Sequence, residues 1–132
     1  MRLRVRETDL VRACLAWLAL YRVKAWRMNN TGVYDPARKV FRSFRGEKGV
    51  PDILGILPQT VTLAGGDRVT FGNFLGVECK RPGQKPRPEQ EAFLNDLRER
   101  GGIGICVHDL DVLERQLQPF LAGSGGRGAG EG

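Results

Sequence analysis

Two segments of the chain place charged side chains at the ends of predicted strands. Asp52 immediately precedes an apolar run over residues 53–57. Glu78 and Lys80 follow a second run, over residues 71–77, which is rich in aromatic and β-branched residues. A Gly-Gly-Asp turn signal lies between the runs, so they are expected to pair as a hairpin that brings Asp52 near Glu78 and Lys80. Because residues two apart leave a strand on the same face, the sequence predicts two carboxylates and one ammonium at one end of a sheet.

This group of side chains suits metal-assisted phosphate chemistry. Carboxylate oxygens are the ligands that a hard cation such as Mg²⁺ requires, and such an ion keeps positions open for water and substrate phosphate. A lysine beside the metal can orient the attacking water and offset the charge that develops on the phosphate. The ordinary alternative is a solvated ion pair for Glu78 and Lys80, with Asp52 serving a turn after Pro51.

Length and composition indicate one domain of ordinary globular character. The 132 residues suffice for a single core, and residues 122–132 are rich in glycine, so we expect a domain over residues 1–121 and a flexible tail. No apolar run approaches the length that spans a bilayer. Arginines interrupt the apolar segment near the N-terminus and no small-residue cleavage site follows it, which argues against secretion. Three widely spaced cysteines and a single histidine form no zinc-binding pattern and favour a reducing, cytoplasmic location.

Positive charge is concentrated in the first part of the chain. The net charge is +6, and residues 1–50 hold twelve Lys or Arg against four Asp or Glu. This asymmetry is typical of a chain that binds a polyanion, most simply nucleic acid, although a solvated basic surface has the same composition. Within residues 33–48, aromatic side chains alternate with basic ones, which suits phosphate contact with stacking on bases. An edge hairpin protected from aggregation by its charges is the alternative.

The periodicity of residues 7–21 predicts an amphipathic helix. Its apolar face holds Leu10, Val11, Cys14, Leu15, Leu18 and Tyr21. Glu7 falls on the same face, in the first helical turn. It either interacts with the helix dipole alone or delivers a third carboxylate to the end of the sheet.

The other predicted elements alternate strands and helices. They are strands at 23–28, near 39–45 and at 103–107, and helices at 88–100 and 110–121. A loop with three prolines and three basic residues precedes the helix at 88–100. Gln90 is placed on the inward face of that helix, near the strand ends, and His108 is expected to be structural.

These residues resemble the PD-(D/E)XK nuclease superfamily, with its Asp motif at Pro51-Asp52 and its second motif at Glu78-Cys79-Lys80. Within it, the chain is most similar to the VRR-NUC (virus-type replication-repair nuclease) family, over about residues 7–107. The marks of that family, in order, are Glu7, Trp26-Arg27-Met28-Asn29-Asn30-Thr31-Gly32, Gly49-Val50-Pro51-Asp52-Ile53-Leu54, Glu78-Cys79-Lys80, and Gln90 with Phe93. The resemblance implies an α/β, restriction-endonuclease-like fold with a central mixed β-sheet flanked by helices.

The resemblance also implies a Mg²⁺- or Mn²⁺-dependent endodeoxyribonuclease without a nucleotide cofactor. Asp52, Glu78 and the backbone carbonyl of Cys79 would ligate the metal, and Glu7 would do so directly or through water. Lys80 would position the nucleophilic water, and Gln90 would fix Lys80 or that water. The side chains expected to contact DNA are those of Arg27, Asn30, Arg42, Arg45, Lys48, Arg81, Lys85 and Arg87.

Small stand-alone members of this family are similar to resolvases of four-way (Holliday) junctions. We therefore expect a structure-selective endonuclease of a phage or prophage that acts in the host cytoplasm. A homodimer suits the substrate, because two sites related by a two-fold axis can cut symmetric strands.

Three alternatives stay open at this point. One is a flap or replication-fork nuclease of the same fold, and another is a DNA-binding module without activity, which need not retain all the site residues. A sequence-specific enzyme would need a recognition insertion, and the hairpin at 60–75 is the one candidate. Its apolar residues suit dimer contact or core better; they are Val61, Leu63, Val69, Phe71 and Phe74.

Overall fold

A mixed four-stranded sheet with helices on both faces forms the body of the protein. The computed structural model describes residues 6–28, 33–42 and 46–122. Its elements are α1 (Glu7–Leu20), β1 (Lys24–Arg27), β2 (Val33–Asp35), β3 (Val40–Arg42), β4 (Ile53–Thr62), β5 (Arg68–Cys79), α2 (Pro88–Glu99), β6 (Ile103–Val107) and α3 (Leu110–Ala122). The strand order is β1-β4-β5-β6, antiparallel except for the parallel pair β5–β6. The expected α/β class, a central mixed sheet flanked by helices, is confirmed.

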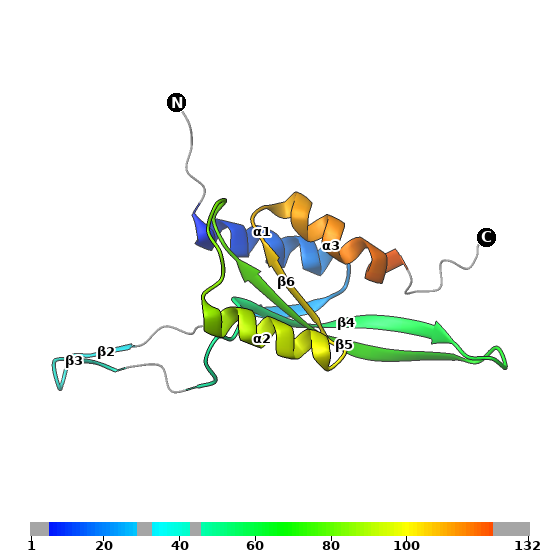
Figure 1. Ribbon diagram of the computed structural model, residues 1–132, viewed down its shortest axis with the longest axis horizontal. Coiled ribbons are helices and arrows are strands. Elements are labelled where there is room, and N and C mark those ends of the chain that lie inside the picture. Colours follow the sequence, from blue (N-terminus) through cyan, green and yellow to red (C-terminus); the bar gives the residue numbers. More distant parts are fainter. Residues whose placement is uncertain (1–5, 29–32, 43–45, 123–132) are drawn as a thin grey trace, which may run out of the picture.

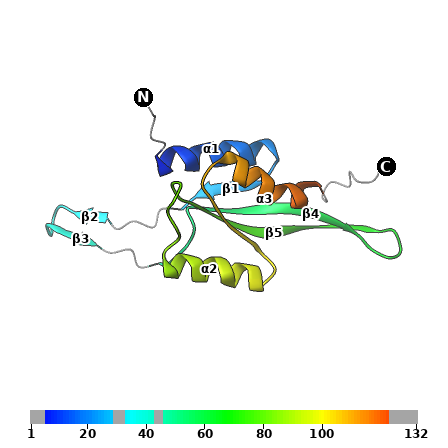
Figure 2. The ribbon, with the colours of Figure 1, turned by 45° about the horizontal axis from the view of Figure 1, so that its top comes forward.

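The helices divide between the two faces of the sheet. Helices α1 and α3 lie on one face and α2 lies on the other (Figures 1 and 2). The main core forms between the sheet and the first pair of helices, with fully buried side chains such as Leu18, Leu57, Leu75, Leu113 and Leu117. No helix in the described part of the chain has the length and apolar character needed to cross a membrane.

The first helix begins at Glu7, as its periodicity predicts, and ends at Leu20, one residue before the predicted end. Leu10, Val11, Cys14 and Leu18 are buried, whereas Tyr21 is partly exposed at the helix end, where its ring packs on Trp17. The assignment of position 21 to the buried face was therefore wrong, because the chain leaves the helix at that residue.

The hairpin of β4 and β5 is longer than the apolar runs predict. The apolar run over residues 53–57 predicts a strand that ends before Pro58, but β4 continues through that proline to Thr62. β1 pairs with β4 only from Ile53 to Ile56, so the part of β4 after Ile56 is an edge strand. An edge strand tolerates proline, which has no N–H to donate. The far half of the hairpin extends past the helices (Figure 1). Its apolar side chains are nearly half exposed and so do not belong to the core; they are Val61, Leu63, Val69, Phe71 and Phe74.

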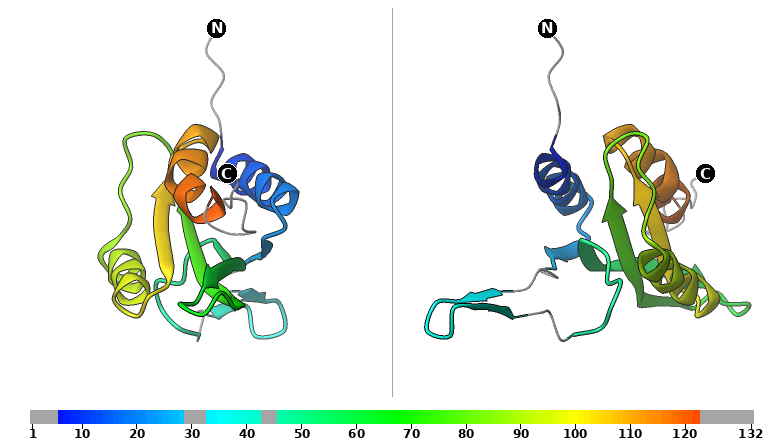
Figure 3. Two further views of the ribbon diagram at one scale, coloured as in Figure 1. Left: turned by 90° about the vertical axis from the view of Figure 1, so that its right-hand side faces the viewer. Right: turned by 60° about the vertical axis from the view of Figure 1, so that its left-hand side comes forward.

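A separate two-stranded ribbon, β2 with β3, stands away from the body (Figure 3). The strand expected near residues 39–45 corresponds to β3, and Tyr34 of β2 lies opposite Phe41 of β3 in the register.

Candidate active site

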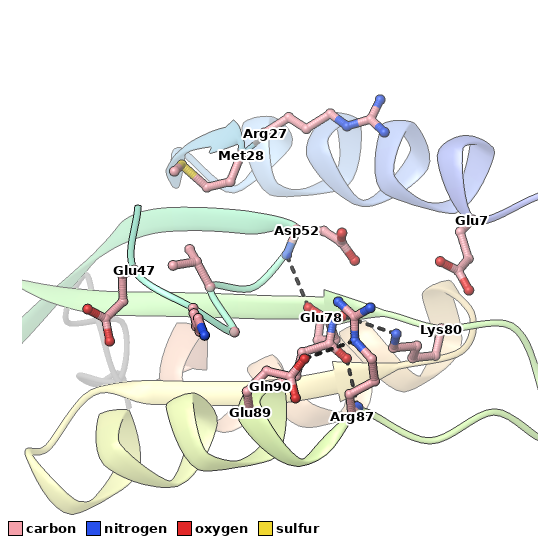
Figure 4. Close-up of a pocket in the computed structure, with 13 residues that line it drawn as sticks. Glu7, Arg27, Met28, Glu47, Asp52, Glu78, Lys80, Arg87, Glu89 and Gln90 are labelled. Atoms are coloured by element: carbon pink, nitrogen blue, oxygen red, sulfur yellow. Dashed lines mark hydrogen bonds and ion pairs between the residues drawn. The ribbon is translucent and has the colours of Figure 1, made fainter. Parts of the chain in front are cut away.

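The pairing of β4 with β5 brings the three predicted side chains together. Val77 lies opposite Ile53, so Asp52, just before β4, lies beside Glu78 near the end of β5. The two strand ends exchange hydrogen bonds: the Asp52 N–H donates to Glu78 Oε1 (3.2 Å), and the Cys79 N–H donates to Asp52 Oδ2 (2.9 Å). Lys80 Nζ lies 3.5 Å from Glu78 Oε2. The expected convergence of two carboxylates and one ammonium is therefore what the structure contains (Figure 4).

The lysine and the cysteine beside it point in opposite directions, as the strand period predicts. The Cys79 side chain is buried in the core, where its hydrogen bond with the Cys14 thiol, together with burial, raises its thiol pKa. Two contacts hold the backbone of Lys80. Its N–H donates to the Val107 carbonyl (3.0 Å), and its carbonyl oxygen lies 3.2 Å from Nδ1 of His108. These contacts agree with a structural role for His108.

The three groups lie in a cavity of about 710 Å³ at the end of the sheet. It is lined by Glu7, Arg27, Met28, Glu47, Lys48, Gly49, Val50, Asp52, Glu78, Lys80, Arg87, Glu89 and Gln90. The Glu78 side chain is 2% exposed and that of Lys80 is 13% exposed, so both are shielded from bulk water. Glu7, from the first turn of α1, reaches the rim, where its carboxylate lies 4.0 Å from Arg81 Nε.

Gln90 reaches the cavity from the first turn of α2 and is buried, with 7% of its surface exposed. Its carboxamide oxygen accepts a hydrogen bond from the Arg87 N–H (2.8 Å), which closes the start of the helix. The inward orientation predicted for Gln90 is therefore correct. Its proposed contact with Lys80 or with water stays a prediction.

Burial sets the protonation of the two inner carboxylates. Desolvation raises the pKa of Glu78 to about 7, the Asp52 charge adds to the effect, and Lys80 opposes it. Desolvation likewise raises the pKa of Asp52, while the hydrogen bond from the Cys79 N–H lowers it and Glu7 raises it. Lys80 lowers the pKa of both carboxyl groups and Arg27 lowers that of Asp52, but desolvation outweighs them, so a further cation would favour the charged carboxylates.

This donor set fits a hard divalent cation. Mg²⁺ in nucleic-acid enzymes is commonly held by one or two carboxylates, with water and substrate phosphate completing its shell. Among the described residues, no group of three or more His, Cys, Asp or Glu side chains is arranged to hold a metal ion. The fit therefore rests on Asp52 and Glu78 as the protein carboxylates. Ligation by the Cys79 carbonyl, and by Glu7 directly or through water, stays a prediction.

The residues expected to contact DNA fall into three sets. Arg27, Lys48 and Arg87 line the cavity. Arg81 lies at the rim beside Glu7, and Lys85 is exposed on the following loop. Asn30 and Arg45 lie outside the described residues, as does the side chain of Arg42.

Two acidic lining residues, Glu47 and Glu89, escaped sequence reasoning. The signal that could have found them is Gly49, between the basic segment and the Asp motif. Its φ of +77° is left-handed, and a Cβ at this position would collide with the Glu89 carbonyl oxygen. This close approach joins the loop before β4 to the start of α2, and both segments thereby enter the cavity wall.

Replacing Gly49 by alanine is expected to open this wall. The left-handed φ and the collision with the Glu89 backbone both oppose a side chain, so Gly49→Ala should cost more than about 1 kcal/mol of folding free energy. Urea denaturation measures this loss. Gly65→Ala is the matched control, because a Cβ there would meet no atom within 4 Å, and it should unfold with the wild type. Equal stability of both variants would contradict the described contact.

The chain is similar to a curated phage protein. The chain is 37% identical over 71 residues to "Putative nuclease p44" of Acyrthosiphon pisum secondary endosymbiont phage 1. The match covers 54% of this chain and 57% of that protein, so the chain spans little more than half the length of this curated relative. No protein-family model matches the chain. No solved structure matches it.

Proposed function

We propose that this protein is a divalent-metal-dependent nuclease that hydrolyses phosphodiester bonds of DNA. The observation that carries the proposal is the convergence of Asp52, Glu78 and Lys80 in a cavity at the end of the sheet. The phage relative, whose description is that of a nuclease, supports the same class of activity. The excess of basic residues in the first part of the chain favours a polyanionic substrate.

Each residue of the site has a separate task in this reaction. Asp52 and Glu78 would hold Mg²⁺ or Mn²⁺, which when bound supplies a Lewis acid for the phosphate and lowers the pKa of a coordinated water. Lys80, held by its backbone contacts and paired with Glu78, positions the attacking water and offsets charge on the phosphate. Arg27, Lys48 and Arg87 bind phosphates on either side of the cleaved bond.

We further propose that the substrate is a branched DNA, most specifically a four-way junction, and that the active species is a homodimer. The exposed apolar residues of the β4–β5 hairpin support dimer contact, since Val61, Val69 and Phe71 lie outside the core and next to one another in the strand register. A dimer with two-fold symmetry would present two cavities to symmetric strands of a junction.

Cleavage of a labelled four-way junction beside a linear duplex of the same sequence tests this proposal. We expect paired, symmetric nicks in the junction with Mg²⁺ or Mn²⁺ and far slower cutting of the duplex. Equal rates on both substrates would contradict junction selectivity but would still support the proposed nuclease activity. Cutting only at flaps or free ends would contradict the four-way junction as substrate and indicate a flap or end-directed nuclease. Binding without any cutting would indicate a DNA-binding module without activity.

A further inference from the structure

The β2–β3 ribbon lies in the chain between two segments that line the cavity. Arg27 and Met28, which precede it in the chain, line the cavity, and so do Glu47 and Lys48, which follow it. The ribbon projects outward from this side of the body, at the opposite end from the long hairpin (Figures 1 and 3).

The body of the protein does little to stabilise the ribbon. The polar side-chain contacts of its described residues are internal to the ribbon. Asp35 Oδ1 accepts the N–H groups of Ala37 (3.0 Å) and Arg38 (3.3 Å), and Arg38 Nε lies 4.0 Å from Asp35 Oδ2. Tyr34 is 56% exposed and Val40 is 48% exposed. Because an isolated two-stranded hairpin is marginally stable in water, a ribbon of this kind gains most from a bound partner.

Charge identifies the chemistry of that partner. Arg38, with 77% of its side chain exposed, and Lys39 lie at the turn that joins the two strands. Residues 27–48 hold six Lys or Arg against two Asp or Glu. An exposed tyrosine beside cationic side chains suits a polyanion with a regular array of phosphates, and a two-stranded β-ribbon fits the major groove of duplex DNA.

We propose that the β2–β3 ribbon binds the duplex that adjoins the cleaved phosphate, with Arg38 and Lys39 on the DNA backbone. This inference rests on the proposed function, because it takes DNA as the ligand of the cavity. In this arrangement the ribbon adds phosphate contacts to those made by Arg27 and Lys48, which line the cavity. The ribbon would thereby set the direction in which the bound duplex leaves the cavity.

Metal-free DNA binding tests the ribbon without any need for cleavage. Wild type and an Arg38→Gln/Lys39→Gln variant are compared by fluorescence anisotropy in EDTA, on a labelled duplex and on a single strand of equal length, over a range of salt concentrations. The matched control is Arg68→Gln/Arg115→Gln, which removes the same charge from the far tip of the hairpin and from α3. Thermal unfolding followed by circular dichroism shows whether all variants fold, as expected for side chains outside the core.

The inference predicts that the ribbon variant binds the duplex about tenfold more weakly than wild type, with the slope of log K against log salt reduced by about two. The affinity of the control variant for the duplex should stay within about twofold of that of wild type. Unchanged affinity and slope in the ribbon variant would overturn the inference, as would an equal loss in the control. An equal loss of affinity for the single strand would overturn the assignment of the ribbon to duplex DNA. Ribbon-dependent binding would support the inference even if wild type proved unable to cut, so the two proposals fail separately.

Discussion

Replacing Lys80 by alanine is expected to reduce the rate of DNA cleavage by about three orders of magnitude while leaving DNA binding nearly intact. The Lys80 side chain is 13% exposed and its Nζ lies 3.5 Å from Glu78 Oε2, so under the proposed function it would act inside the cavity and not on an outer DNA-binding surface. Single-turnover cleavage at saturating enzyme measures the rate, and anisotropy in EDTA measures binding.

Lys24→Ala is the matched control for this experiment. Lys24 is an exposed lysine of β1 outside the cavity lining, so its loss should leave both measurements near those of wild type. A wild-type cleavage rate in Lys80→Ala would remove this residue from the chemistry. A loss of binding as large as the loss of rate would reassign it to substrate affinity.

Neutralising Glu78 is expected to abolish cleavage and, in the metal-free protein, to stabilise the fold. The pKa of Glu78 is about 7 in the folded protein, above the ordinary value of 4.5, because burial disfavours its charge. Between these two pH values the folded state keeps a proton that the unfolded chain has released. Rising pH therefore favours unfolding, and the full cost, of the order of 3 kcal/mol, is present above the folded pKa.

The Glu78→Gln variant lacks this titration, so its stability advantage over wild type should grow from pH 5 to pH 8 by about this amount. Urea denaturation in EDTA at several pH values measures the difference. Adding Mg²⁺ should raise the stability of wild type toward that of the variant, because a ligand that binds only the folded state stabilises that state. Glu99→Gln, at an exposed carboxylate that folding does not bury, is the control. A constant difference across the pH range would contradict the account of Glu78.

The opposed effects expected at Glu78 have one physical origin. A carboxylate shielded from water is costly for the fold, and the same shielding strengthens its attraction for a cation. Under the proposed function, the site would trade stability for the binding of metal, as is common where a fold carries chemistry.

The sequence was sufficient to predict most of the elements and the inner site. Alternation on a strand separates Glu78 and Lys80 from Cys79, and helical periodicity turns Gln90 inward. Both predictions depend only on local geometry, which the chain carries in its own spacing. The structure places these side chains as expected.

What the sequence could not supply depends on contacts between distant segments. Pro58 lies inside a strand because β1 stops pairing before it, and no local pattern encodes that limit. Glu47 and Glu89 meet the cavity because Gly49 allows two backbones to touch. The isolation of the ribbon depends likewise on which strands pair with which, since β2 and β3 form a sheet of their own.

Cleavage of end-labelled branched DNA over a titration of Mg²⁺, compared between wild type and Asp52→Asn, decides whether this cavity is a metal-dependent nuclease site. We expect no product in EDTA, a saturable rise of the wild-type rate with Mg²⁺, and almost no product from Asp52→Asn at any Mg²⁺ concentration. Cleavage by wild type in EDTA, or a wild-type rate in Asp52→Asn, would contradict the assignment of this cavity as a metal-dependent nuclease site.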